Sequence, residues 1–196
     1  MTQRSVDLDS LHDVQAVKRV FHDDSLPYRP YAPGDWETPA FLPLGNERHQ
    51  VRMTASTHDQ RGILQHSSAD ALANTRRLST KVAGNTPTLY RLDEREGATT
   101  LIVTYGITSG AASAAVERLH QLGEPVSLLV ARTLLPVPSI YYEIIDRYAR
   151  VVFAEENLQG QFASLLFGGR RPAEVKLVGD IGHMVEPEQI VREVLR

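Results

Sequence analysis

Two adjacent carboxylates, Glu155 and Glu156, are the first candidates for chemistry in this sequence. They open the segment that runs to Gln161 and also holds Asn157 and Gly160. An apolar run precedes this segment and a helical pattern follows it, which places both carboxylates at the carboxyl end of a strand, where α/β proteins often bind ligands. Neighbouring side chains at a strand end point to opposite sides, so the pair does not form a catalytic dyad by itself. Helix capping and subunit contact are the favoured roles, with acid–base catalysis as the alternative.

A second candidate is the pair His58 and Asp59, in a loop rich in hydroxyl side chains. The spacing of this pair to other His and acidic residues fits neither a helical His pair for zinc nor an oxygen cage for calcium. We expect both side chains to tie the loop to neighbouring backbone. Contact with a partner's active site is one alternative, and a hydrolase built on the pair is another.

Two further segments follow predicted strands. Tyr105 and Gly106 stand where a strand gives way to a helix, the position at which α/β folds bind phosphate on free amide groups. The sequence there lacks the glycine spacing of a dinucleotide fingerprint and the Lys of a P-loop, so a tight packing turn is favoured and a bound anion is the alternative. The segment from Leu134 to Pro138, which also holds Pro136 and follows Arg132, predicts an apolar turn buried against another surface.

The second half of the chain supplies the scaffold for these segments. Strands are expected at 99–104, 125–130, 150–154 and 175–178. Helices are expected at 110–122 with Ser109 as its cap, from 138 onward, at 160–167 and at 187–195. This alternation predicts an α/β fold of three layers, a mostly parallel sheet with helices on both faces and right-handed crossovers.

The first half predicts a proline-rich, partly helical N-terminal arm. Prolines spaced through 27–43 exclude a central strand, because proline has no amide proton to donate. Residues 8–21 and 69–82 carry helical patterns. The charged stretch 93–97 ends in glycine and is typical of a linker, so the expected boundary divides the chain into an arm, 1–94, and an α/β domain, 95–196.

Composition narrows the function classes. The chain has 196 residues, of which 42% are hydrophobic, a formal charge of −3 and no Cys. The missing Cys excludes a disulfide, a thiol nucleophile and a cysteine-ligated zinc or iron–sulfur cluster on this chain. The near-neutral charge argues against a nucleic-acid partner. No secretory signal and no apolar run of about 20 residues is visible, so we expect a cytoplasmic protein with no membrane contact.

The segments described above resemble the C-terminal part of the α subunit of a 2-oxoacid:ferredoxin oxidoreductase, particularly the 2-oxoglutarate type. The resemblance covers almost the whole chain. It is most specific in residues 155–161, and it is also carried by 132–138, by Tyr105-Gly106 and by the 54–59 loop. The second half, 98–196, resembles more loosely the C-terminal domain of transketolases.

This resemblance implies an enzyme that uses thiamine diphosphate with magnesium to decarboxylate a 2-oxoacid, passes electrons through iron–sulfur clusters to ferredoxin and releases acyl-CoA. It implies that residues 1–94 include the end of a preceding thiamine-enzyme domain. The pyrimidine-side thiamine domain would lie before residue 1, and the β subunit would hold the diphosphate and metal.

This chain would then carry no catalytic residue, cofactor or metal ligand of its own. Its partners would be the remainder of the α subunit, the β subunit and, through the complex, ferredoxin. The rival interpretation is a free-standing doubly wound module that binds a small anion or nucleotide.

Overall fold

The computed structural model describes residues 7–10, 18–23, 27–32, 38–54 and 56–196. Contacts divide the chain into two compact units, Met1–Gly84 and Asn85–Arg196. This division falls before the charged stretch at which the sequence predicted a boundary. The reason is that strand β1, Tyr90–Asp93, is part of the sheet of the second unit.

The second unit is built on a five-stranded sheet in the order β1-β3-β2-β4-β5. The remaining strands are β2 (Thr100–Tyr105), β3 (Val126–Ala131), β4 (Arg150–Glu155) and β5 (Val175–Gly179). Strands β3, β2, β4 and β5 pair in parallel, and β1 pairs with β3 in the antiparallel sense. The predicted mostly parallel sheet is confirmed.

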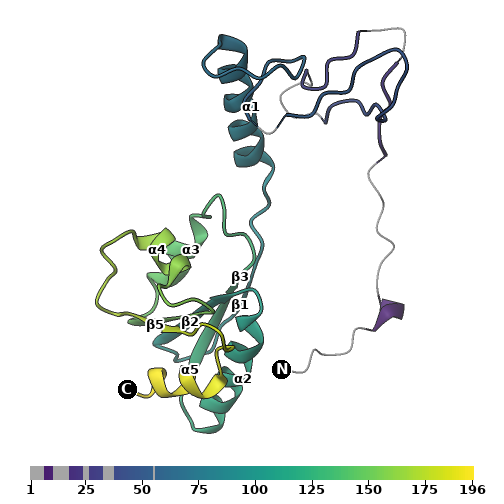
Figure 1. Cartoon of the computed structure of the whole chain (residues 1–196). Coiled ribbons are helices and arrows are strands. Elements are labelled where there is room, and N and C mark those ends of the chain that lie inside the picture. Colours follow the sequence, from purple (N-terminus) through teal and green to yellow (C-terminus); the bar gives the residue numbers. More distant parts are fainter. Residues whose placement is uncertain (1–6, 11–17, 24–26, 33–37, 55) are drawn as a thin grey trace. The chain divides into compact units, whose positions relative to one another are not determined.

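Helices cover both faces of this sheet, as predicted. They are α2 (Thr108–Gln121), α3 (Ile140–Ile145), α4 (Gln161–Phe167) and α5 (Pro187–Val194). Figure 1 shows α2 and α5 together on one side of the sheet and α3 and α4 on the other. Two apolar cores result. Leu119 of α2 and Ile190 of α5 pack in one core, and Ile144 of α3 and Phe162 of α4 pack in the other.

The central strands are buried on both faces, which explains why their sequences are continuous apolar runs. Alternate residues of β2 enter different cores: Leu101 and Val103 lie in one and Ile102 in the other. Helix α5 begins at a capping box in which the Glu186 and Gln189 side chains each accept a hydrogen bond from the other residue's backbone N–H.

The predicted start of α2 is wrong. The helix begins at Thr108, one residue before the expected cap, and its N-cap is Ile107. The Ser109 hydroxyl instead donates a hydrogen bond of 2.7 Å to the Gly106 carbonyl oxygen. Serine favours such local bonds to backbone, and here the bond closes the turn rather than capping the helix.

Strand β1 was missed from the sequence because it is short, exposed and charged. Its four residues include the exposed Arg91 and Asp93, which form an ion pair of 3.0 Å. The strand is tied to the sheet by the buried Thr133, whose hydroxyl donates to the Pro87 carbonyl oxygen at 2.6 Å and accepts from the Leu89 amide at 2.9 Å.

Replacing Thr133 with Val should therefore weaken the attachment of β1. Valine keeps the shape but leaves the Leu89 amide and Pro87 carbonyl without this partner, so we expect the free energy of unfolding to fall by about 1–2 kcal/mol. Thr133→Ser keeps the hydroxyl and should cost less. Urea unfolding of both variants checks this, and equal losses would contradict the role of the hydroxyl.

Helix α1, Ala69–Asn85, lies in the first unit except for its last residue, and it confirms the helix predicted at 69–82. The helix predicted at 8–21 is not found in its described part. A short 3-10 helix, η1, spans Leu8–Ser10, residues 18–20 have no helical structure, and 11–17 lie outside the described residues. Phe21 instead forms a parallel bridge with Phe41 of the proline-rich segment. No helix in the described ranges is long and apolar enough to cross a membrane.

Candidate functional site

Three of the segments singled out in the sequence lie at one edge of the sheet. Tyr105-Gly106 follows β2, residues 132–138 follow β3, and residues 155–161 follow β4, and these strands are neighbours in the order β3-β2-β4. The chain leaves β2 towards α2 on one face and leaves β4 towards α4 on the other (Figure 1). Such a divergence at the carboxyl ends of adjacent strands is where open α/β sheets bind their ligands or partners. We call this region the carboxyl edge.

Glu155 is buried at the carboxyl edge, where it holds the start of α4. Its side chain is 1% exposed. One carboxylate oxygen accepts from the Phe162 amide at 2.8 Å and from the Asn157 side chain at 2.9 Å, and the other accepts from the Ala163 amide at 3.0 Å. The carboxylate thus satisfies amides in the first turn of the helix, which otherwise lack partners. Glu156 is exposed, so the two carboxylates diverge as the strand geometry predicted.

The rest of this loop is fixed by Asn157 and Gly160. The Asn157 side-chain oxygen accepts hydrogen bonds from the amides of Gln159 and Gln161 at 3.2 and 3.1 Å. Gly160 has φ 64° and ψ 60°, and a Cβ at this position would lie 2.5 Å from a methyl carbon of Leu177. Only glycine adopts this conformation without strain in so tight a space. The segment is therefore a rigid turn.

Tyr105 lies against this turn from the end of β2. Its ring packs edge-on against Phe162 with centroids 5.6 Å apart, and its hydroxyl is 3.5 Å from the Asn157 side-chain nitrogen. Burial, together with the negative charge of Glu155, raises the pKa of Tyr105, and the Asn157 contact opposes this shift. Tyr105 is therefore a neutral phenol at physiological pH.

Two amides of the turn after Tyr105 are bonded within the turn. Gly106 has φ 59°, and the amides of Ser109 and Gly110 donate to the carbonyl oxygens of Gly106 and Ile107. Those two amides are not available to an anion. The packing role favoured from the sequence thus agrees with the geometry better than the phosphate-binding alternative.

The segment 132–138 is held mainly by its backbone. The amides of Arg132 and Thr133 both donate to the Leu89 carbonyl oxygen, at 3.1 and 2.9 Å, while the Arg132 side chain is exposed. Pro138 is buried and Pro136 is exposed. The end of this turn is buried within the chain, and contact of its exposed middle with another surface stays a prediction.

His58 and Asp59 belong to a tight hairpin in the first unit. The His58 ring stacks on Tyr31 with centroids 3.6 Å apart. The Asp59 carboxylate accepts from the amides of Arg61 and Ile63 at 2.9 and 3.0 Å and from the Gln65 side chain at 3.0 Å. These bonds are all within the hairpin, which is the loop-tying role that the sequence favoured.

This hairpin should be sensitive to acid through Asp59. The Ile63 amide bond lowers the pKa of Asp59 below its ordinary value of 3.8, and Arg61 adds to this effect against the opposing influence of burial. Because the pKa of Asp59 is lower in the folded state, its ionised carboxylate stabilises the fold at pH values above its unfolded-state pKa. This stabilisation is lost as the pH falls through its folded-state pKa. The NMR chemical shift of the Ile63 amide should be constant above about pH 4 and should change as the pH falls further. In Asp59→Asn this titration should vanish; its survival would contradict the assignment.

Thiamine diphosphate and magnesium, which the resemblance implies for the complete enzyme, require metal ligands. Within the described ranges, no three His, Asp or Glu side chains come together as candidate ligands. At the carboxyl edge the one buried carboxylate is already bonded to α4. The side chains there do not fit such a group, and we derive no step through it.

The carboxyl edge carries a feature that the sequence analysis missed. Apolar side chains project from the turn after every parallel strand and are more than half exposed: Ile107 54%, Leu135 66%, Leu158 67% and Ile181 65%. A signal existed, because each lies within five residues of the end of a predicted strand. Scattered exposed apolar residues are ordinary, but a set at one edge is typical of an interaction surface.

The comparisons with known proteins agree with this architecture. The chain is similar to 2-oxoglutarate synthase subunit KorA of Methanocaldococcus jannaschii, with 28% identity over 188 residues that make up 94% of this chain and 50% of that subunit. The resemblance predicted from the sequence is confirmed. This chain spans about half the length of the KorA subunit that it matches. No family model matches the chain.

The fold has a relative among solved structures. It is similar to 2-oxoglutarate:ferredoxin oxidoreductase from Magnetococcus marinus, a structure with 2-oxoglutarate, coenzyme A and succinyl-CoA bound, with a TM-score of 0.71 and 24% identity. The similarity covers 92% of this chain and 32% of that one. The fold predicted from the sequence is therefore found in an oxidoreductase of the expected class.

Proposed function

We propose that this chain is the structural and assembly part of the α subunit of a thiamine-diphosphate-dependent 2-oxoacid:ferredoxin oxidoreductase that converts 2-oxoglutarate to an acyl-CoA. The observation that carries the proposal is the engagement of Glu155, since the one buried carboxylate of the carboxyl edge is bonded to the first turn of α4 and to Asn157. The similarity to KorA along 94% of the chain supports the choice of family.

In this proposal the carboxyl edge docks onto a companion. Its turns are rigid, and its projecting side chains, such as Leu135 and Leu158, are apolar and exposed. Rigid positioning matters because a displacement of about 1 Å in an active site can lower the rate by orders of magnitude. Thiamine diphosphate, magnesium, the iron–sulfur cluster and coenzyme A would be held by the rest of the α subunit and by the β subunit, in a cytoplasmic heteromer that passes electrons to ferredoxin.

Reconstitution tests this proposal. The purified chain alone should not oxidise 2-oxoglutarate with ferredoxin or a viologen as acceptor, and activity should appear when the remainder of the α subunit and the β subunit are added. Turnover by the chain alone would place chemistry on it and overturn the proposal. Lack of any complex with these companions would overturn it as well.

The rival function, a free-standing module that binds a small anion, rests on the turn at Tyr105 to Ser109. Titration calorimetry of the chain with inorganic phosphate and with acyl-CoA separates the two. We expect no binding, because the amides of Ser109 and Gly110 already donate within the turn. Tight binding without any companion would favour the rival.

A further inference from the structure

Strand β5 leaves one edge of the sheet open. It is the last strand in the order β1-β3-β2-β4-β5, and no other described strand pairs with its outer side. The amide of Val151 in β4 donates to the Glu174 carbonyl oxygen, and Val151 lies opposite Val175 in the register. In a parallel ladder alternate residues bond to the neighbour, so the N–H and C=O groups of Leu177 point away from β4, towards the open edge.

Two hollows border this open edge. One, of about 710 Å³, is lined by the loop from Gly169 to Ala173 together with β5. The other, of about 210 Å³, lies between β5 and α5 and is lined by Arg192 and Arg196 among others. Leu177 lines both hollows, so they follow one another along the strand. An extended chain laid along β5 would therefore find room for its side chains in both hollows.

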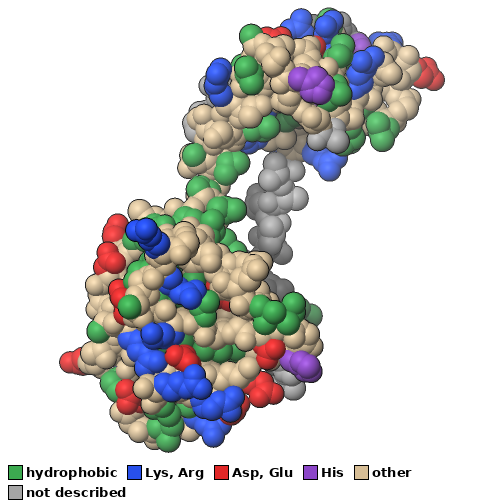
Figure 2. All heavy atoms as spheres, turned by 60° about the vertical axis from the view of Figure 1, so that its left-hand side comes forward, with side chains coloured by type: hydrophobic (Ala, Val, Ile, Leu, Met, Phe, Trp, Pro, Cys, Tyr) green, Lys and Arg blue, Asp and Glu red, His purple; other side chains and the backbone are tan. Residues whose placement is uncertain are grey.

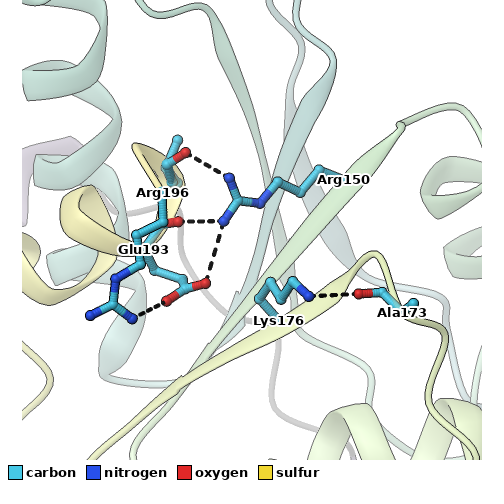
Figure 3. A network of polar contacts seen from close by, with 6 residues as sticks. Arg150, Ala173, Lys176, Glu193 and Arg196 are labelled. Carbon is cyan, nitrogen blue, oxygen red and sulfur yellow. Dashed lines mark hydrogen bonds and ion pairs between the residues drawn. The ribbon is translucent and has the colours of Figure 1, made fainter.

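The border of these hollows is positively charged. Its exposed cations are Arg170, Arg171, Lys176, Arg192 and Arg196, and its one acidic residue is Glu193. Glu193 is mostly buried and is bonded to Arg150 at 3.3 Å and Arg196 at 3.1 Å (Figure 3). Lys176 donates only to the Ala173 carbonyl oxygen, at 2.7 Å, so its charge is not neutralised by that bond. Figure 2 shows Lys and Arg side chains gathered in a band over this side of the second unit.

We infer that β5 is an interaction edge, on which an extended, acidic segment of a companion subunit adds as a sixth strand. Addition of a strand satisfies the outward backbone groups of β5, and the four cations other than Arg196, which is paired with Glu193, select for carboxylates on the added segment. The same charges disfavour pairing of β5 with β5 of a second copy, because Lys and Arg would face Lys and Arg. The inference rests on the proposed function, since it takes the occupant from the assembled enzyme.

Hydrogen exchange tests the inference directly. In the chain alone, the Leu177 amide should exchange quickly, because it faces the open edge. In the complex with the rest of the α subunit and the β subunit, its exchange should slow at least about tenfold, as expected for a new backbone hydrogen bond. Assembly without slower exchange at Leu177 would overturn the inference alone. Failure to assemble would overturn the proposed function and the inference together.

A matched pair of variants adds a second measurement. Leu177→Pro removes an outward amide that β5 does not need for its own ladder, and Leu177→Ala keeps that amide while shortening the side chain. Because proline also fixes φ near −65°, urea unfolding of both variants checks that β5 is folded in each. Leu177→Pro should bind the companions at least about tenfold more weakly than Leu177→Ala. Equal affinities would show that β5 is only a charge-protected edge and would contradict strand addition.

A charge variant and a polyanion control test whether β5 selects an acidic protein segment or binds any polyanion. Replacing Arg170 and Arg171 together with Glu should weaken binding of the companions about tenfold and should reduce the salt dependence of that binding, since Lys176 and Arg192 remain. If heparin slows exchange at Leu177 in the chain alone as strongly as the companions do, a general polyanion site replaces the acidic strand and the inference is overturned.

Discussion

Replacing Glu155 with Ala is expected to lower the free energy of unfolding of the second unit by about 3 kcal/mol. The change leaves the amides of Phe162 and Ala163 without their acceptor in a buried place, and it frees the Asn157 side chain. An unsatisfied buried donor costs about 1–3 kcal/mol, and here two backbone donors are affected. Urea unfolding followed by circular dichroism measures the loss.

Two variants serve as controls for Glu155. Glu155→Gln keeps one acceptor oxygen but turns an amide group towards a donor, so its loss should be intermediate. Glu156→Ala, at the exposed neighbour, should change the free energy of unfolding by no more than about 0.5 kcal/mol. If the Glu155 and Glu156 variants were equally stable, the capping role of Glu155 would be wrong.

Gly179→Ala should destabilise the second unit by about 2–4 kcal/mol, for a steric reason. A Cβ on Gly179 would overlap the carbonyl oxygen of Asn157 and would lie 3.3 Å from its carbonyl carbon. Both atoms belong to the backbone of the turn after β4, so relief of the overlap requires that the turn moves. Thermal unfolding should show a lower midpoint, and the Tyr105 ring signals should shift because the Tyr105 hydroxyl is 3.5 Å from the Asn157 side chain.

The matched control is Gly169→Ala. Gly169 has no atom within 4 Å of the added Cβ and no positive φ, so the substitution should be neutral or slightly stabilising through the unfolded chain. Equal destabilisation at Gly169 and Gly179 would indicate a general intolerance of side chains and would refute the close approach at Asn157.

The parallel strands and their helices were predictable because burial on both faces leaves long apolar runs, as in β2 and β3. The divergence of Glu155 and Glu156 followed from strand geometry alone. Strand β1 was not predictable in this way, since Arg91 and Asp93 interrupt any apolar pattern and its pairing depends on a residue as distant as Thr133.

The candidate site was predictable in position but not in detail. The sequence places three segments at strand ends, and the strand order that makes those ends adjacent comes only from the crossovers. The bonds of Glu155 to Phe162 and Ala163 depend on the turn that Asn157 and Gly160 fix. The open edge at β5 was likewise invisible, since a strand's sequence does not state whether a neighbour lies beside it.

Turnover by the assembled enzyme tests most directly whether this chain supplies contacts rather than chemistry. The measurement is kcat for 2-oxoglutarate oxidation with Tyr105→Phe and Glu156→Gln chains, each added until the complex is saturated. These changes remove the Tyr105 hydroxyl and the charge of Glu156, two polar groups of the carboxyl edge that are not needed to fold it. We expect kcat within about twofold of that of the unmodified complex. The variants should differ, if at all, only in needing a higher concentration of chain to saturate the complex. A fall of about a hundredfold or more in kcat in a fully assembled complex would contradict this expectation, since that size is typical of a lost catalytic group.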